Sequence, residues 1–80
     1  MYRVIIHNDD YTTREFVVEV LVYVFHKLVP EATELMWRVH RKGSGVAGVY
    51  PRDVAETKVV TVVQMARDAE FPLKVTMEPD

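Results

Sequence analysis

The chain has 80 residues, of which 49% are hydrophobic, and its 12 acidic and 10 basic residues give a formal net charge of −2. A single domain of this size buries only about 60–65% of its unfolded surface, which leaves little room for a deep active site. The absence of cysteine excludes disulfides and cysteine zinc sites, and mixed charges without a basic block disfavour nucleic acid as the main partner.

A short β-strand over Tyr2–His7 is the first predicted element, because the run is rich in β-branched and aromatic residues. The acidic turn Asn8-Asp9-Asp10 follows it directly. Asn and Asp commonly turn the chain by bonding to their own backbone, so these residues alone do not require a ligand. An amide and two carboxylates ahead of a helix are also the acceptors that a bound cation needs. Both interpretations are open at this point.

The helix after this turn has two predicted start signals. With Thr12 as the N-cap, Glu15 falls at the third helical position, which is the spacing of a capping box. Tyr11 and Phe16 are then spaced as a hydrophobic staple. The apolar stripe and its extra valines predict a helix from residue 13 to about residue 28.

A second helix and a second strand are predicted next. Pro30 suits a first helical turn, so the helix restarts there and runs to about Lys42. The glycines of Gly43-Ser44-Gly45 end it, and residues 46–50 form a predicted strand. Within that strand, Gly48 indicates a bulge or a close backbone approach.

A third helix and a third strand complete the predicted domain. Pro51 opens a helix that runs to about Ala69. Residues 73–77 alternate with period two, which places Leu73, Val75 and Met77 on one face of a strand. The order βααβαβ predicts a single α+β domain over residues 1–80, with three helices packed on a small three-stranded sheet.

Five blocks of this sequence resemble the ClpS adaptor family, in order and without large gaps, over Tyr2 to about Glu78. The blocks are the run Asn-Asp-Asp-Tyr-Thr-x-x-Glu-Phe from Asn8, Glu31-Ala32-Thr33 with Met36, Val39-His40, Gly48-Val49-Tyr50, and Val54-Ala55-Glu56-Thr57-Lys58.

The resemblance implies a protease adaptor rather than an enzyme. Such an adaptor binds an N-degron, a free N-terminal Leu, Phe, Tyr or Trp of a substrate protein, and delivers that protein to a ClpA- or ClpC-type AAA+ unfoldase. The implied location is the bacterial cytoplasm or the plastid stroma. No cofactor, metal, nucleic acid or membrane partner is expected.

The residue types at the implied site are suited to binding a free α-amine. A free α-amine is a cation with three donors, and Asn8, Asp9 and a neutral His40 offer acceptors. Taken without the resemblance, a histidine at an apolar helical phase is more often structural than a ligand. The peptide-binding residues that the resemblance implies are Asn8, Asp9, Asp10, Thr12, Arg14, Val17, Met36, Val39, His40 and Leu73.

The resemblance also implies a docking surface for the unfoldase at Asp53, Glu56 and Lys58, although exposed charges of this kind most often form a solvated helix face. Two features depart from the family pattern. Thr13-Arg14 stands where the family usually has Pro-Met, and we expect the Arg14 guanidinium to stack on an aromatic ligand at the mouth of the socket. The family also carries a flexible N-terminal extension, which we expect this chain to lack.

Two alternatives are open on sequence grounds. His7, Asp9, Asp10 and His40 have side chains that can ligate a metal, although no His-x-x-x-His spacing supports a metalloenzyme. The βααβαβ order also resembles the C-terminal domain of the ribosomal stalk protein, a protein interaction module, but this chain lacks the lysine- and alanine-rich helical face typical of that domain.

Overall fold

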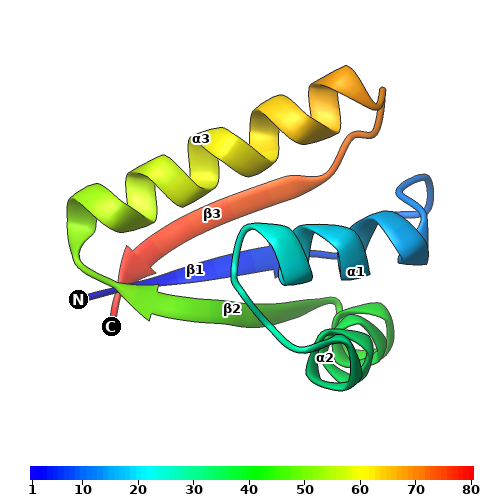
Figure 1. Cartoon of the computed structure of the whole chain (residues 1–80), viewed down its shortest axis with the longest axis horizontal. Coiled ribbons are helices and arrows are strands. Elements are labelled where there is room, and N and C mark those ends of the chain that lie inside the picture. The colour runs from blue at the N-terminus through cyan, green and yellow to red at the C-terminus, as the bar shows by residue number, and fades with distance from the viewer.

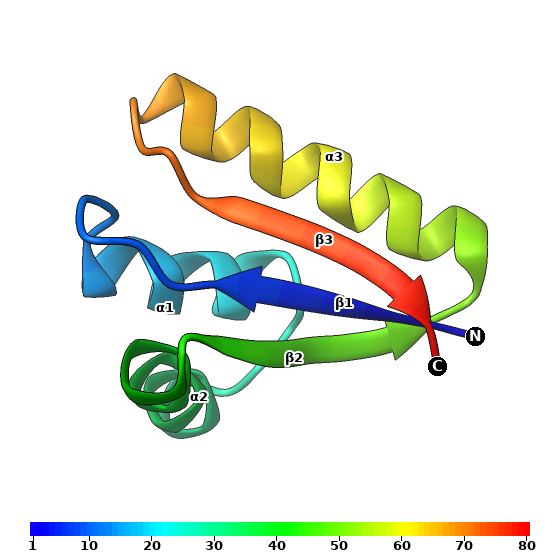
Figure 2. The same cartoon turned by 180° about the vertical axis from the view of Figure 1, so that it is seen from behind.

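The computed structural model describes residues 1–80 and contains three strands and three helices. In chain order they are β1 (Tyr2–His7), α1 (Arg14–Tyr23), α2 (Val29–Lys42), β2 (Ser44–Tyr50), α3 (Arg52–Asp68) and β3 (Lys74–Pro79). The strands form an antiparallel sheet in the order β2-β1-β3. Figure 1 shows α1 in front of the sheet, and in Figure 2 the strands lie in front with no helix across them. The predicted α+β architecture is confirmed.

The core lies between the central strand and the helices. All of the buried residues are apolar. One atom of a charged group is also covered, the Nε of the partly buried Arg3, and it has no hydrogen-bond partner. Val4 and Ile6 of β1, Leu21 of α1 and Val62 of α3 are completely buried. Burial of side chains this size stabilises by about 1.5–3 kcal/mol each. None of the helices combines the length and the apolar character that crossing a bilayer requires.

The predicted start of α1 is wrong by one residue. Thr13 is the N-cap, and its hydroxyl accepts a hydrogen bond from the Phe16 backbone N–H at 3.2 Å. Glu15 therefore cannot complete a capping box, because the third helical position is Phe16. The predicted staple is also absent, since Tyr11 is 79% exposed. Thr12 does not cap the helix because its hydroxyl already donates a hydrogen bond to Asp9 in the preceding turn.

The end of α1 also differs from the prediction, because the helix stops at Tyr23 rather than near residue 28. His26 adopts a left-handed backbone conformation with φ of 57°. The Lys27 N–H then bonds back to the Leu21 carbonyl at 3.0 Å. A left-handed residue breaks the helical repeat, so the chain after Tyr23 forms a turn, in which Val24 and Phe25 are buried, instead of continuing the helix to residue 28.

The junction between α2 and β2 is tight. Gly43 alone caps α2, with φ of 94°, and the strand begins at once with Ser44. A Cβ at Gly45 would lie 2.9 Å from a methyl carbon of Val39, so only glycine fits this approach. Of the two expectations for Gly48, the bulge is confirmed, whereas the group that lies close to Gly48 is a side chain and not another stretch of backbone. The register shifts around Ala47, which is the extra residue of a β-bulge, and a Cβ at Gly48 would lie 2.3 Å from the Tyr50 hydroxyl.

The third helix and strand match their predictions within two residues at each end. α3 spans Arg52–Asp68 after its N-cap Pro51, and it ends where Glu70 takes a left-handed conformation with φ of 62°. β3 spans Lys74–Pro79, with Leu73 just before it. Leu73 and Val75 are buried and Met77 is partly buried, as the period-two pattern predicts.

Candidate functional site

A cleft of about 580 Å3 opens between the turn after β1, the first turns of α1 and the C-terminal half of α2. We call it the acidic cleft. Its walls contain every predicted peptide-binding residue except Leu73. The lining residues are Asn8, Asp9, Asp10, Tyr11, Thr12, Thr13, Arg14, Glu15, Val17, Met36, Val39 and His40.

The acidic cleft has an apolar floor contributed by two helices. Val17 comes from α1, while Met36 and Val39 come from one face of α2 because residues three apart on a helix are neighbours. They are 7%, 6% and 2% exposed, so their side chains belong to the core and only their surfaces reach the cleft. An apolar group that entered would displace water from these surfaces and contact a rigid floor.

Asp9 organises the polar wall of the cleft. Its Oδ1 accepts the N–H of Tyr11 at 2.8 Å and the N–H of Thr12 at 2.6 Å, and its Oδ2 accepts the Thr12 hydroxyl at 2.7 Å. Partial burial raises the pKa of the Asp9 carboxyl, but these hydrogen bonds outweigh it and hold the pKa below its ordinary value of 3.8. Asp9 is therefore an anion at neutral pH. Since a carboxylate has about four acceptor positions, it retains one for a ligand.

Asn8 is placed through its backbone. The Asn8 N–H donates to the Gly43 carbonyl at 2.9 Å, which ties the acidic turn to the C-terminal end of α2. The same end of α2 carries His40, three residues before Gly43. Asn8 and His40 are both exposed, and both line the cleft. Residues 32 positions apart in sequence thus provide acceptors to one cavity.

Arg14 and His40, at the rim of the cleft, share an aromatic neighbour that the sequence analysis missed. The Arg14 guanidinium carbon lies 5.0 Å from the centroid of the Trp37 ring. The His40 ring meets the same indole edge-on, with centroids 5.8 Å apart. The aromatic partner of Arg14 in the structure is therefore Trp37, whereas we expected a ligand. The spacing of Trp37 and His40, three residues apart on one helix, is a signal that could have indicated their contact.

Leu73 is the one predicted peptide-binding residue that does not line the cleft. It is 6% exposed and lies on the inward face that continues into β3, where the period-two alternation directs it into the core. Tyr11, Thr13 and Glu15 do line the cleft and were not predicted as site residues. Tyr11 and Glu15 were assigned to the start of the helix, as staple and capping-box residues, and that assignment obscured their position at the cavity.

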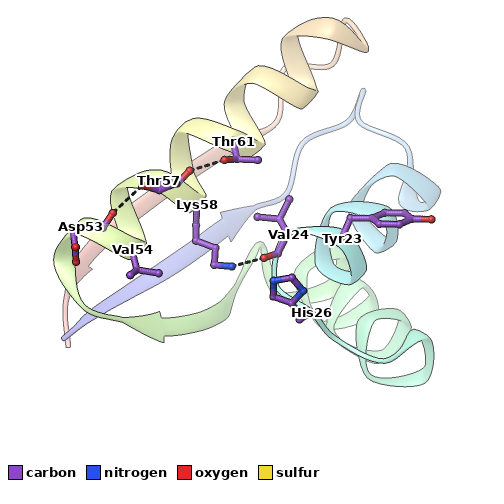
Figure 3. A pocket seen from close by; sticks show the side chains of 8 residues that line it. All are labelled: Tyr23, Val24, His26, Asp53, Val54, Thr57, Lys58 and Thr61. Atoms are coloured by element: carbon purple, nitrogen blue, oxygen red, sulfur yellow. Dashed lines mark hydrogen bonds between the residues drawn. The ribbon is translucent and has the colours of Figure 1, made fainter.

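A second cleft of about 420 Å3 lies between the end of α1 and the N-terminal half of α3 (Figure 3). We call it the lysine cleft. Asp53 and Lys58 line it, but Glu56 does not and instead pairs with Arg52 on the exposed helix surface at 3.1 Å. The lining residues are Tyr23, Val24, His26, Asp53, Val54, Thr57, Lys58 and Thr61.

Lys58 is bound within the chain. Its ammonium donates to the Val24 carbonyl at 2.6 Å, as Figure 3 shows. It also lies 5.3 Å from the Tyr50 ring centroid and 6.0 Å from that of Phe25. Cations favour the C-terminal end of a helix, where carbonyls lack partners. Lys58 therefore closes α1 as well as lining the cleft.

The alternative metal site does not form. No group of three or more histidine, aspartate or glutamate side chains comes together in a way that could hold a metal ion. His7, one of the four candidates, has its Nε2 at 2.8 Å from the Thr76 hydroxyl on the neighbouring strand. The residues of the metalloenzyme hypothesis are thus divided between the sheet and the acidic cleft.

Comparisons with known proteins agree with one another. Residues 1–76 match the family model described as ATP-dependent Clp protease adaptor protein ClpS. The chain is 61% identical over its full length to the ClpS adapter protein of Desulfatibacillum aliphaticivorans, covering 77% of that protein. It is 56% identical over its full length to that of Acetivibrio thermocellus, covering 81%.

Among solved structures, Agrobacterium tumefaciens ClpS2 bound to L-phenylalaninamide superposes with a TM-score of 0.95. It is 44% identical, and the match covers 99% of this chain and 95% of that one. These matches favour the adaptor family over the ribosomal-stalk-like alternative.

Proposed function

The chain belongs to the ClpS family of ATP-dependent Clp protease adaptor proteins, and we propose that it captures substrate proteins by a free N-terminal residue in the acidic cleft. One observation carries the proposal. A single cavity combines hydrogen-bond acceptors and an ionised carboxylate at its rim with an apolar floor. A solved relative, ClpS2, is bound to L-phenylalaninamide, a molecule with a free α-amine and a phenyl ring.

The α-amine is assigned to Asn8, Asp9 and His40. An ammonium group donates three hydrogen bonds, so it matches an amide oxygen, a carboxylate oxygen and a neutral imidazole nitrogen. The contribution of hydrogen bonds to charged groups is about 1.5–3 kcal/mol each. The free acceptor position on Asp9 is held in place by the Tyr11 and Thr12 bonds before any ligand binds. Such preorganisation reduces the entropy lost on binding.

The first side chain is assigned to the floor formed by Val17, Met36 and Val39. Burying about 150–250 Å2 of an aromatic ring at about 25 cal/mol per Å2 contributes roughly 4–6 kcal/mol. Together with the amine contacts, this must offset an association cost of about 4–15 kcal/mol. The proposal therefore favours bulky hydrophobic first residues, Leu, Phe, Tyr or Trp, over small ones, with affinities near micromolar.

Delivery is assigned to a ClpA- or ClpC-type unfoldase that contacts the chain around the lysine cleft, through Asp53 and the exposed Glu56. The lining residues of the two clefts share no member. Substrate and unfoldase can then bind at the same time. Lys58 contributes by fixing the end of α1 beside Asp53, since its ammonium is held by the Val24 carbonyl.

Anisotropy with two labelled peptides that both begin with Phe tests substrate capture. One peptide has a free α-amine and the other is N-acetylated. Acetylation deletes the cation and would leave Asp9 facing the ligand unpaired, at a cost of about 2–5 kcal/mol. We expect the acetylated peptide to lose measurable binding. Equal affinity for the two peptides contradicts the amine site.

A charge reversal tests the docking surface independently. Asp53→Lys should weaken binding to the isolated N-terminal domain of the unfoldase, while affinity for the free Phe peptide stays unchanged. Glu34→Lys, an exposed reversal on α2 outside both clefts, is the matched control for net charge. If both reversals weaken unfoldase binding equally, the effect is one of overall charge and the assignment of the lysine cleft fails.

A further inference from the structure

We infer that Trp37 is a positioning residue for N-terminal recognition, which holds the Arg14 guanidinium at the rim and so keeps it from competing with the substrate's α-amine. The inference rests on the proposed function of the acidic cleft. Trp37 itself is absent from the cleft lining. It nevertheless contacts two lining residues from different helices, Arg14 of α1 and His40 of α2.

The position of Arg14 in the helix is unfavourable for a cation that has no stabilising contact. It is the first residue of α1, at the positive end of the helix dipole, where a cation is unfavourable. Three carboxylates, those of Asp9, Asp10 and Glu15, line the same cavity. Yet Arg14 belongs to none of the ion pairs of the chain, which join Arg3 and Arg52 to other acids. Its neighbour is instead the ring of Trp37.

The acceptors that suit an ammonium group also suit a guanidinium, which has five N–H donors. Arg14 is tethered at the mouth of the cleft, so if it were released its local concentration there would be of millimolar order, as for a ligand on a short flexible linker. A released Arg14 would thus occupy the amine position or cover the mouth. The face of an indole attracts a guanidinium, so Trp37 removes this internal competitor.

The strength of the contact between Arg14 and Trp37 sets how far ligand affinity should fall when the contact is removed. An exposed cation–π contact shifts an equilibrium by roughly two- to five-fold. We therefore expect Trp37→Leu, which retains an apolar side chain but no ring, to weaken the binding of L-phenylalaninamide by about that factor. Trp37→Phe retains a ring face and should bind within about two-fold of the parent.

A double-mutant cycle separates this role from a packing role. In the Arg14→Met background there is no cation to release, so Trp37→Leu should have little further effect on affinity. If Trp37→Leu weakens binding equally in both backgrounds, Trp37 acts through packing or through His40, and the inference is wrong. No effect in either background also overturns it. Calorimetric titration with L-phenylalaninamide gives all four affinities.

Intrinsic fluorescence tests the contact without changing Trp37. The chain contains one tryptophan, so its emission reports this site alone. Arg14→Met should change the emission, whereas Arg67→Met, which removes an exposed arginine from the end of α3, should not. Unchanged emission in Arg14→Met shows that the guanidinium does not rest on the ring in solution and overturns the inference.

Different results would contradict the proposed function and the role of Trp37. If the parent chain does not bind L-phenylalaninamide at all, the proposed function of the acidic cleft is wrong. If the parent binds it and the double-mutant cycle shows no coupling between positions 14 and 37, the function stands and only the role of Trp37 is wrong. Thermal unfolding of each variant confirms that the measured losses concern folded protein.

Discussion

Asp9 and Thr12 are joined by two hydrogen bonds, one from the Thr12 N–H to Oδ1 at 2.6 Å and one from the Thr12 hydroxyl to Oδ2 at 2.7 Å. Both carboxylate oxygens are thereby fixed by a residue three positions later. The pair closes the turn that precedes α1 and orients an anion towards the acidic cleft. This anion is in place before a ligand arrives, which is how a small domain can recognise a single residue.

Thr12→Val should destabilise the fold in a pH-dependent way. The variant keeps the shape of the side chain but loses the hydroxyl donor, at a cost of about 1 kcal/mol. Because the pKa of Asp9 is lowered in the folded chain, its stabilising contribution is present above the ordinary pKa of 3.8 and is lost as the pH falls through the lowered value. Denaturant unfolding of parent and variant should therefore differ most at pH 7 and converge as the pH falls below 3.8.

The control for this prediction is Thr33→Val. Thr33 donates its hydroxyl to the Val29 carbonyl on the exposed side of α2, so its loss involves no ionisable partner. The difference in unfolding free energy between Thr33→Val and the parent should be the same at pH 7 and at acid pH. A pH-independent loss in Thr12→Val as well shows that the hydroxyl does not act through the Asp9 charge.

His40→Ala should bind a peptide with a free N-terminal Phe more weakly than the parent does. An imidazole nitrogen that carries no proton can accept a hydrogen bond from the α-amine, and alanine offers no acceptor. The loss of a hydrogen bond to a charged group costs about 1.5–3 kcal/mol. Fluorescence anisotropy measures both affinities, and an unaltered affinity in the variant assigns His40 a structural role.

Lys58→Met should lower thermal stability. The substitution keeps the length of the side chain but leaves the Val24 carbonyl, now accepting from Lys58 at 2.6 Å, without its donor. An unpaired, partly buried acceptor costs about 1–3 kcal/mol, and for a domain of this size each kcal/mol lowers Tm by about 4–8 °C. Lys74→Met, an exposed lysine on β3, should change Tm little. Equal melting of the two variants contradicts a role for Lys58 in closing α1.

Glu70→Gly should stabilise the chain. Glu70 has φ of 62°, and the Phe71 N–H bonds to the Ala66 carbonyl at 2.8 Å, which is the Schellman ending of α3. A left-handed conformation costs a non-glycine residue about 1–2 kcal/mol. After the greater unfolded-state entropy of glycine is subtracted, we expect a gain of about 0.5–1 kcal/mol.

Ala69→Gly is the adjacent control, because Ala69 has φ of −88° and gains no relief. It should be destabilised by roughly the same amount as Glu70→Gly is stabilised. Chemical denaturation at neutral pH compares the two. Destabilisation in both variants would mean that the left-handed turn at Glu70 carries no strain.

Sequence reasoning succeeded for the elements whose local signals admit one interpretation. β1 is defined by its β-branched run, α2 by Pro30 at its start and Gly43 at its end, and β3 by period-two alternation. The resemblance to the adaptor family also rests on residues in fixed order, and the family match over residues 1–76 confirms it. In each case the residue type restricts its own backbone or that of its immediate neighbours.

Pattern alone did not decide between two neighbouring caps. Thr12 and Thr13 are equally suited to cap α1, and the bond from the Thr12 hydroxyl to Asp9, three residues earlier, leaves Thr13 as the N-cap. The tertiary structure decided what depends on partners far away in sequence. The end of α1 depends on Lys58, which is 34 residues from Val24. Arg14 was expected to stack on a ligand, but Trp37 on another helix lies beside it. A carbonyl or a guanidinium has several possible partners in the chain, and only packing brings one of them within bonding distance.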